Sequence, residues 1–293
     1  MFNVYFIRDG YRGTHALRRF CPGGKGEWKN IKSVDEMDDA DVLVICGTPF
    51  MGFDFASFSP EKIMYYKLEP DEFWFVPFYW KYVNPSSHMI TMDAHPRFAT
   101  WDIKKTYDEL LNNDFPEKTK RLSWVTTNYG DGTQEPDIQV LSGHRLRMKF
   151  LKDFLKKYPD EMILYGRRLE NYKYKCNKGA LYDKWEGLAD YRYTFSFMNS
   201  SQIGFFDEKL VDAIMAGCMP MVWGCPNLED FLPKNSFIRL DITKDDAIDE
   251  AVEIANSDFR EQNLDELKEA KRILLTELSL MPQLWKDINE RMD

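Results

Sequence analysis

An acidic and a basic residue, Glu208 and Lys209, stand side by side at the predicted start of a helix. A period-two run and a polar loop that contains Gly204 precede them, so strand, loop and helix follow one another. The free N–H groups and the dipole of a helix N-terminus favour an anion. Lys209 opposes that dipole, and a bound phosphate would reverse the disadvantage. Glu208 has oxygens that would accept hydrogen bonds from a ribose diol. The pattern suits a nucleoside-diphosphate site, and an ordinary solvent-facing Glu–Lys pair explains these residues equally well.

Other familiar chemistries have less support in the sequence. The four histidines, His15, His88, His95 and His144, lack the spacing of metal ligands, so we interpret them as surface or internally satisfied residues. There is no GxGxxG, GxxxxGK[ST], HExxH or GxSxG motif. Residues 39–41 match the DxD pattern that holds a metal–diphosphate in some enzymes. They precede a predicted strand instead of following one, so we interpret the match as accidental.

The second half of the chain predicts a parallel α/β unit around Glu208 and Lys209. Strands are expected at 122–127, 162–165, 193–198 and 219–223. Ser142 is expected to cap a helix whose apolar face repeats every four residues from Leu146 to Phe154. A second helix is expected from Asp207, and Gly217 would end it. Strand–helix–strand units with short connections imply a parallel sheet, and ligands bind such sheets beyond the carboxyl ends of the strands.

The first half predicts another α/β unit, with a cleft between the two. Strands are expected at 4–7, 42–46, 63–68 and 89–92, and a helical stretch at 104–112. Residues 73–80 (FWFVPFYW) are the densest aromatic run, and they either pack between elements or offer a stacking surface to a sugar-sized ligand. At the end of the chain, 265–292 is expected to form two amphipathic helices, broken near Met281 and Pro282.

The composition limits the class of protein. The 293 residues are 44% hydrophobic and 30% charged, which is enough for a substantial core and too apolar for a disordered chain. The net charge is −9, so nucleic acid is not an expected partner. Five cysteines without a CxxC pair favour a reduced compartment. No run approaches the ~18 apolar residues of a membrane span, and the first residues do not form a signal sequence. We therefore expect a soluble, cytoplasmic protein without an integral membrane segment.

Three segments of the second half occur in a characteristic order. They are FSFMNS at 195–200, DEKL at 207–210 and AGCMPMVWG at 216–224. Together they resemble the signature of glycosyltransferase family 10, the α-1,3/1,4-fucosyltransferases, which reads roughly F-x-F-E-N-S, T-E-K-L and A-G-x-x-P-V-x-x-G. Residues 227–238 (NLEDFLPKNSFI) continue the likeness, since the family has a run ending in F-L-P-x-x-S-F-I. Upstream, 142–150 and LYGR at 164–167 match more weakly.

The resemblance implies a GT-B-like α/β fold, with two Rossmann-like domains whose parallel sheets face a central cleft. The family transfers fucose from GDP-fucose with inversion and needs no metal ion, so neither a metal nor a cofactor is expected beside the donor substrate. Carried over to this sequence, Glu208 would bind the ribose and Lys209 the diphosphate. Arg147 matches the family's phosphate-binding arginine, and Asn199 would lie at a strand end close to the donor. A surface Arg147 paired with Asp153 or Glu161 is the alternative.

Two positions depart from the family pattern. Met198 stands where the family has the Glu of F-E-N-S, and Phe205, at the expected donor site, stands where it commonly has Tyr. A site that hydrogen-bonds a sugar hydroxyl discriminates poorly without its polar partner. The expected donor is therefore GDP-fucose or another nucleotide sugar, such as a UDP-sugar, and the acceptor is a glycan or glycoconjugate hydroxyl. A carbohydrate-binding homologue without catalysis is the alternative from another class.

An inverting transfer in one displacement also needs a general base for the acceptor hydroxyl. Glu69 follows a predicted strand that Pro70 ends, and the aromatic run after it would desolvate the carboxylate. Family members carry a similar strand ending in an N-L-E-P-like or G-E-N-like segment whose Glu is the base, and KLEP is close to the first. We expect Glu69 to be the catalytic base, with Asp71 and Glu72 as competing candidates.

The expected domain limits follow from these segments. Residues 1–118 would form the acceptor-side α/β domain, 119–270 the Rossmann-like domain for the nucleotide sugar, and 271–293 C-terminal helices that pack back on the first domain. The lack of a membrane anchor favours a bacterial or viral enzyme that acts on cytosolic glycans.

Overall fold

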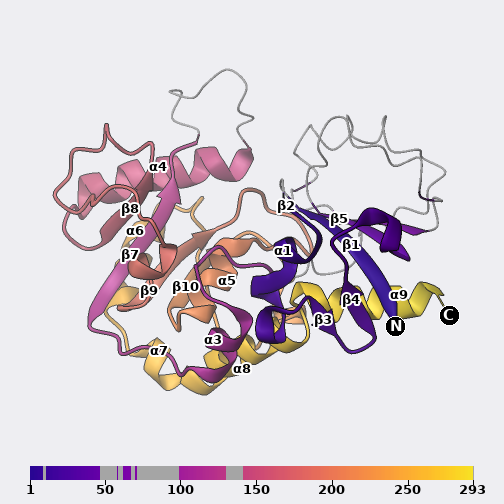
Figure 1. Cartoon of the computed structure of the whole chain (residues 1–293). Helices are drawn as coiled ribbons and strands as arrows, with labels where there is room; N and C mark the ends of the chain where they lie inside the picture. The colour runs from indigo at the N-terminus through magenta and orange to yellow at the C-terminus, as the bar shows by residue number, and fades with distance from the viewer. Residues whose placement is uncertain are drawn as a thin grey trace. The chain divides into compact units, whose positions relative to one another are not determined.

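The structure, a computed structural model, describes residues 1–8, 11–46, 58, 62–66, 70, 99–129 and 141–292. The chain divides into two compact units that exchange short segments (Figure 1). Unit 1 contains Met1–Ala99, Lys105–Asn113 and Leu275–Asp293, and unit 2 contains Thr100–Lys104 and Asp114–Leu274. The sequence-based limits of three consecutive domains stay a prediction.

Unit 1 is built on a mainly parallel sheet. Its strands are β1 (Phe2–Arg8), β2 (Tyr11–Arg12), β3 (Glu27–Trp28), β4 (Ile31–Ser33), β5 (Val42–Cys46) and β6 (Ile63–Tyr66). The order is β3-β4-β1-β5-β6, and β2 pairs with β1. Strands β4, β1, β5 and β6 run parallel, whereas β2 and β3 pair antiparallel with their neighbours. The strand expected at 89–92 and the aromatic run at 73–80 lie outside the described residues.

Short helices surround this sheet. They are α1 (Gly13–Leu17), α3 (Tyr107–Asn112), α9 (Leu280–Met292) and the 3₁₀ turns η1 (Arg18–Phe20), η2 (Pro22–Gly24) and η3 (Met37–Asp39). Helix α3 is shorter than the expected stretch 104–112, because Thr106 accepts the N–H of Glu109 and Glu109 in turn accepts the N–H of Thr106. This reciprocal cap fixes the start of the helix at Tyr107.

The C-terminal helix α9 packs within unit 1. Tyr66 donates a hydrogen bond of 2.8 Å to Asp287, and the Nζ of Lys29 lies 3.3 Å from the centre of the Trp285 ring. The break between the last two helices is not at Met281 and Pro282, as expected: one helix ends at Thr276 and α9 begins at Leu280. Proline is tolerated in the first turn of a helix, where its missing N–H has no intrahelical acceptor, so Pro282 begins a helix instead of breaking one.

Unit 2 is built on a wholly parallel sheet. Its strands are β7 (Lys120–Thr127), β8 (Ile163–Arg167), β9 (Tyr191–Phe197), β10 (Met219–Trp223) and β11 (Ile238–Arg239), in the order β11-β10-β9-β7-β8. The helices are α4 (Ser142–Lys157), α5 (Glu208–Met215), α6 (Ala247–Ala255), α7 (Phe259–Gln262) and α8 (Leu264–Thr276), with 3₁₀ turns η5 (Lys184–Gly187) and η6 (Leu228–Asp230). The α/β class with two parallel-rich sheets, expected from the sequence, is confirmed.

Strand β9 is the central strand of unit 2 and is buried on both faces. On one face the ring of Phe195 lies 5.4 Å from that of Phe150 in α4. On the other, the Ser196 hydroxyl donates to the main-chain oxygen of Lys209 in α5 at 3.1 Å. Thr194 and Ser196 are therefore as buried as the aromatic residues that alternate with them. Helices on both faces of a parallel sheet account for this, and the buried hydroxyls are satisfied by main-chain oxygens.

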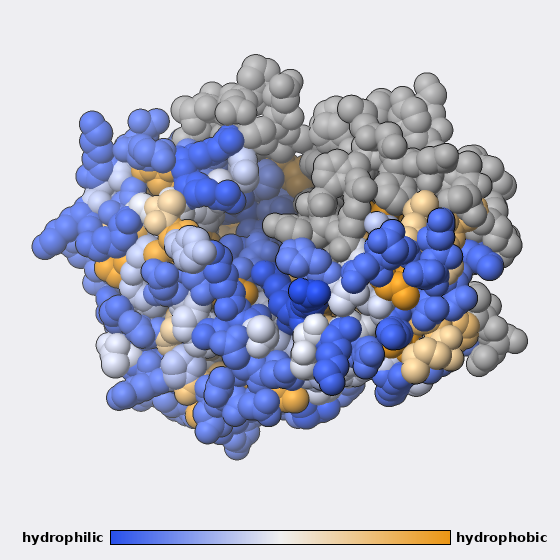
Figure 2. Space-filling model, in the orientation of Figure 1, coloured by the Kyte–Doolittle hydropathy of each residue, from blue (hydrophilic) through white to orange (hydrophobic). Residues whose placement is uncertain are grey.

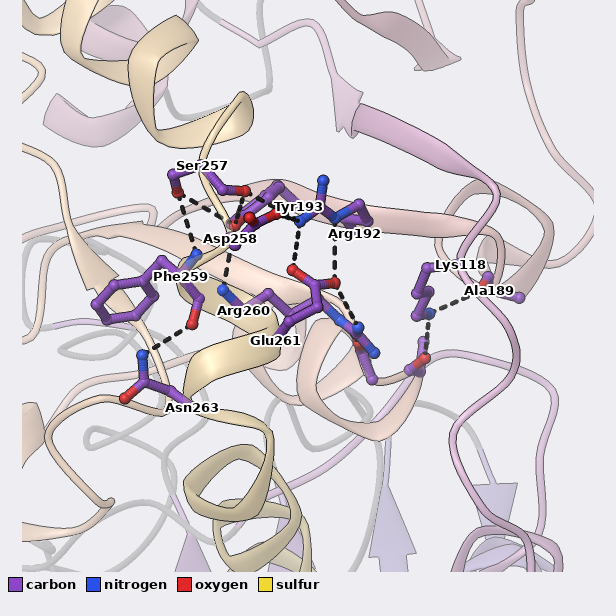
Figure 3. Close-up of polar contacts among 12 residues, drawn as sticks. Lys118, Ala189, Arg192, Tyr193, Ser257, Asp258, Phe259, Arg260, Glu261 and Asn263 are labelled. Atoms are coloured by element: carbon purple, nitrogen blue, oxygen red, sulfur yellow. Dashed lines mark hydrogen bonds and ion pairs between the residues drawn. The ribbon is translucent and has the colours of Figure 1, made fainter.

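A polar network holds α7 against the amino-terminal end of β9 (Figure 3). Arg192 of β9 donates from Nε to Glu261 at 3.1 Å, and Arg260 donates to the same carboxylate at 3.0 Å. Nearby, the ammonium of Lys118 donates to the main-chain oxygen of Ala189 at 2.6 Å. These side chains are engaged with one another at this end of the sheet. A ligand is therefore expected at the opposite, carboxyl end.

The described surface is mainly polar. On the face drawn in Figure 2 hydrophilic residues prevail and apolar ones are scattered among them. Within the part of the chain that the structure describes, no helix is long and apolar enough to cross a membrane. All five cysteines are buried and unpaired with one another.

Candidate functional site

The candidate site lies where β9 ends, in unit 2. The loop that follows β9 packs directly on the first turn of α4, because the N–H of Gly143 donates to the main-chain oxygen of Asn199 at 3.0 Å. A Cβ on Gly143 would lie only 2.3 Å from the main-chain oxygen of Met198. Such a contact is impossible without movement, so glycine is required for this close approach. The start of α4 and the loop after β9 thus form one packed body.

Two cations converge on the side-chain oxygen of Asn199. Arg147 of α4 donates from Nη1 to this Oδ1 at 2.9 Å, and the Nζ of Lys209 lies 3.4 Å from it. Arg147 is 2% exposed, and it also donates from Nη2 to the main-chain oxygen of Thr127 at 3.3 Å. Its Nε is buried with no hydrogen-bond partner among the described residues. The structure therefore brings together Arg147, Asn199 and Lys209, which the sequence places on three different elements.

The alternative in which Arg147 is a surface residue has no support in the structure. Asp153 pairs instead with Lys149 at 2.9 Å, and Glu161 pairs with Arg121. Arg147 contacts neither carboxylate, since it points inward from α4.

The first turn of α5 carries an acidic cap and an ion pair. Asp207 is the N-cap, and its carboxylate accepts the N–H of Lys209 at 3.2 Å and the Nζ of the same lysine at 2.7 Å. The Oε1 of Glu208 lies 3.3 Å from the Nζ of Lys209. The unfavourable position of a lysine in the first turn is therefore offset by two neighbouring carboxylates. The sequence analysis used Asp207 to mark the start of the helix and as the first residue of the DEKL segment, and assigned it no contact in the site.

The charges of this site are strongly coupled. Burial disfavours the charged form of Lys209, but Asp207 and Glu208 outweigh it and raise the pKa of the ammonium. Burial also disfavours the charged form of Glu208, but Lys209 and Lys184 lower the pKa of its carboxyl. For Arg147, burial is the largest cause and lowers the pKa of the guanidinium. Glu208 and Lys209 are therefore ionised at neutral pH, and Arg147 is the cation with no carboxylate in hydrogen-bond contact among the described residues.

His144 supports the start of α4. Its Nδ1 accepts the N–H of Leu141 at 3.2 Å, so Leu141 is the N-cap position and the expected cap at Ser142 is wrong by one residue. The helix starts one residue early because the imidazole of His144 accepts the N–H of Leu141. Histidine is not one of the usual capping residues, so the sequence did not indicate this cap. Burial, followed by the nearby cations Arg147 and Lys209, lowers the pKa of His144 to about 3. The imidazole is therefore neutral at pH 7, with its proton on Nε2.

The two residues that depart from the family pattern are internal. Phe205 is 1% exposed and Met198 is fully buried, where a Cβ on Gly224 would lie 2.6 Å from its side chain. In this chain both side chains are part of the buried core. Glu69, Asp71 and Glu72 lie outside the described residues. In the described ranges, no group of three or more His, Cys, Asp or Glu side chains is arranged to hold a metal ion.

The sequence analysis missed Lys184, which contacts Glu208. The Nζ of Lys184 lies 3.4 Å from the Oε1 of Glu208 and 3.4 Å from the Oδ2 of Asp212. Lys184 precedes Glu208 by 24 residues and belongs to a 3₁₀ turn, so no spacing rule connects the two. Only the tertiary structure reveals this contact.

Cations, a carboxylate and helix N-termini thus gather at the carboxyl end of the central strand of an α/β unit, which is an arrangement that suits an anionic ligand. Residues 115–252 match the family described as "Glycosyltransferase family 10 (fucosyltransferase) C-term". The resemblance to glycosyltransferase family 10 found in the sequence is therefore confirmed over this segment.

Individual relatives match over shorter segments. A "Putative fucosyltransferase-like protein" of Arabidopsis thaliana is 33% identical over 70 residues, which are 24% of this chain and 14% of the relative. The "Alpha-(1,3)-fucosyltransferase FucT" of Helicobacter pylori is 37% identical over 70 residues, 23% of this chain and 14% of the relative. The match thus spans about a seventh of the length of these relatives. A solved α1,3-fucosyltransferase with GDP-fucose aligns at a TM-score of 0.38 and 15% identity, covering 99% of this chain and 74% of the other.

Proposed function

We propose that this protein is an inverting glycosyltransferase that moves L-fucose from GDP-fucose to a hydroxyl of a glycan or glycoconjugate. The observation that carries the proposal is the convergence of Arg147 and Lys209 on Asn199 at the carboxyl end of β9. A diphosphate placed there would receive two charge-assisted contacts and would compensate the buried positive charge of Arg147. The family of the segment favours fucosyl transfer over other uses of such a site.

In the proposed reaction the donor is bound by unit 2. Lys209 and Arg147 bind the diphosphate, Glu208 accepts hydrogen bonds from the ribose diol, and Asn199 keeps the two cations in register. Phe205, being buried, would support the loop from beneath. Unit 1 would supply the acceptor-side residues, including the base Glu69.

The bond changes are those of a single displacement. Glu69 takes the proton of the acceptor hydroxyl while the oxygen of that hydroxyl attacks the anomeric carbon from the face opposite the diphosphate. The bond between the anomeric carbon and the diphosphate oxygen breaks, and GDP leaves with that electron pair. Arg147 and Lys209 stabilise the negative charge that develops on the leaving group. The proposal assigns no step to a metal ion or to a cofactor.

A panel of nucleotide sugars tests the proposal. Purified protein is incubated with GDP-fucose, other GDP-sugars and UDP-sugars, and nucleotide release and donor-dependent thermal stabilisation are followed. We expect GDP-fucose to give the strongest stabilisation and, with a glycan acceptor, release of GDP. Stronger responses to a UDP-sugar would keep the enzyme class and overturn the donor. Donor binding without turnover over a broad acceptor panel would favour the non-catalytic carbohydrate-binding alternative, and no response to any guanine or uracil nucleotide would reject the function.

A further inference from the structure

Lys184 contacts three carboxylates of unit 2 at once. Its Nζ lies 3.0 Å from Asp102, 3.4 Å from Glu208 and 3.4 Å from Asp212. The side chain is 31% exposed, so these pairs are partly shielded from water. Burial opposes the charge of Lys184, but Glu208, Asp212 and Asp102 outweigh it and raise the pKa of the ammonium. Lys184 is therefore a permanent cation beside the first turn of α5.

Asp212 holds the ammonium of Lys184 in position. Its side chain is 2% exposed, and its Oδ1 accepts the N–H groups of Asp102 at 2.8 Å and Ile103 at 3.2 Å. The other oxygen, Oδ2, faces Lys184. Asp212 lies four residues after Glu208 on α5, so the two carboxylates share one side of the helix. Lys184 thus bridges a rigid, fully bonded carboxylate and the more exposed Glu208.

The contacts of Glu208 are asymmetric. The nearest carboxylate oxygen to both Lys184 and Lys209 is Oε1, at 3.4 Å and 3.3 Å. The Glu208 side chain is 27% exposed, so it is accessible from outside. With Oε1 held between two ammonium groups, the orientation of the carboxylate is fixed, and Oε2 is the oxygen with more freedom to accept hydrogen bonds from a ligand.

We propose that Lys184 is a positioning residue that orients Glu208 toward the ribose of the bound nucleotide, an inference that rests on the proposed function. Without Lys184, Glu208 would keep Lys209 as its one cationic partner among the described residues. It would then compete with the diphosphate for that ammonium, and it would lose the geometry that presents Oε2. Lys184 would therefore act on nucleotide affinity through Glu208 and not through contact with the nucleotide.

The test compares GDP affinity by calorimetry in the wild type, Lys184→Met and Lys184→Arg. We expect Lys184→Met to weaken GDP binding about tenfold, the effect of losing roughly 1.4 kcal/mol. Lys184→Arg, which keeps a cation within reach of Oε1, is expected to stay within about threefold of the wild type. Lys184→Gln provides a second, milder neutral variant if the methionine variant does not fold. In turnover, the KM for the donor should rise while kcat and the KM for the acceptor change little.

Asp102→Asn is the matched control. It removes one of the three carboxylate contacts of Lys184 and leaves the Glu208 contact intact. We expect wild-type GDP affinity in this variant. Equal losses in Asp102→Asn and Lys184→Met would show that Lys184 merely anchors the segment at residues 102–103, and would overturn the inference.

A nucleotide without the ribose diol separates the inference from the proposed function. The loss of nucleotide affinity caused by Lys184→Met should fall below about twofold with 2′,3′-dideoxy-GDP or in the Glu208→Gln background. In both cases the interaction between the Glu208 carboxylate and the ribose diol, through which Lys184 would act, is missing. A penalty that persists in both would overturn the inference. If the wild type binds GDP and Lys184→Met binds it equally well, only the inference fails. If the wild type binds no GDP, the proposed function fails and the inference falls with it.

Discussion

Arg147 and Asn199 are 52 residues apart in the sequence, and the guanidinium of the first donates a hydrogen bond of 2.9 Å to the side-chain oxygen of the second. The same oxygen lies 3.4 Å from the ammonium of Lys209. Lys209 is paired with Asp207 and Glu208, whereas Arg147 is almost fully buried and its hydrogen-bond partners among the described residues are neutral. An anionic ligand would supply the missing negative charge. This pair of contacts is the reason to expect a diphosphate at the end of β9.

Replacing Arg147 by alanine should reduce catalysis strongly. Loss of one charge-stabilising contact to a leaving group costs about 2–4 kcal/mol of transition-state stabilisation, which lowers kcat/KM by ~10²–10³. Steady-state kinetics with GDP-fucose measures the effect. Lys149→Ala is the control on the same helix, since Lys149 is 78% exposed and, among the described residues, pairs with Asp153. Unchanged kcat/KM in a folded Arg147→Ala variant would contradict the assignment.

Lys209 should act on the same leaving group as Arg147. Lys209→Ala is expected to lower kcat/KM by a similar ~10²–10³. Because both cations contact Asn199, the double variant should lose less than the product of the two single effects. Kinetics of the four proteins in one series checks this. Strict additivity would indicate that the two cations act at separate places.

Gly143→Ala should disturb the site without removing any of its polar groups. A Cβ there would lie 2.3 Å from the main-chain oxygen of Met198 and 2.6 Å from that of Asn199, and backbone atoms cannot yield as a side chain can. Overpacking of this kind costs about 1–3 kcal/mol of stability. We expect a lower melting temperature together with weaker GDP binding, whereas Lys152→Ala, at an exposed position of the same helix, should alter neither. Wild-type GDP affinity in Gly143→Ala would show that this contact does not position Asn199.

The sequence predicts local structure well where a single element carries the signal. Strands β5 and β10 agree with their apolar runs residue for residue, because turn-forming or polar residues bound both runs. Glu208 and Lys209 occupy the first turn of α5, as their position after Asp207 indicates. The interchange of segments between the units depends on contacts between residues far apart, such as Ala99 with Leu278, and no local pattern encodes them.

The sequence predicts which residues belong to the site, but it does not predict the contacts between their side chains. The motif comparison identifies Arg147, Asn199 and Lys209 separately, and only the folded chain shows that Asn199 contacts both cations. The sequence analysis does not identify Lys184 or Asp212 as part of the site. Their role comes from a crossing of η5 and α5, and neither residue differs in type or spacing from an ordinary surface lysine or helical aspartate.

His144 should make the stability of the protein depend on acidity. Burial and two nearby cations lower its pKa to about 3, whereas a histidine in an unfolded chain titrates near 6.5. Between these values the unfolded state binds a proton that the folded state does not, so stability is present above pH ~6.5 and is lost as the pH falls. The slope is about 1.4 kcal/mol per pH unit.

A variant that lacks His144 isolates this contribution. From pH 6.5 to 5 the wild type should lose about 2 kcal/mol more unfolding free energy than His144→Gln, as measured by urea denaturation at each pH. Carboxylates that titrate in the same range contribute equally to both proteins and cancel. Parallel pH profiles for the two proteins would mean that His144 binds its proton over the same pH range in the folded and unfolded states.

The proposed general base is Glu69, which the sequence places after strand β6 and before Pro70. An inverting displacement requires a carboxylate that removes the acceptor proton, and that group need not contact the nucleotide. Glu69→Gln keeps the shape of the side chain and removes its basicity. GDP affinity should therefore stay at the wild-type value while kcat falls by ~10²–10⁴.

Asp71→Asn and Glu72→Gln are the matched controls, since they remove neighbouring charges of the same segment, and each should retain wild-type kcat. Calorimetry with GDP and turnover with GDP-fucose, measured on all three variants, decide among the carboxylates: a large loss of kcat confined to Asp71→Asn or Glu72→Gln would transfer the role of base to that residue.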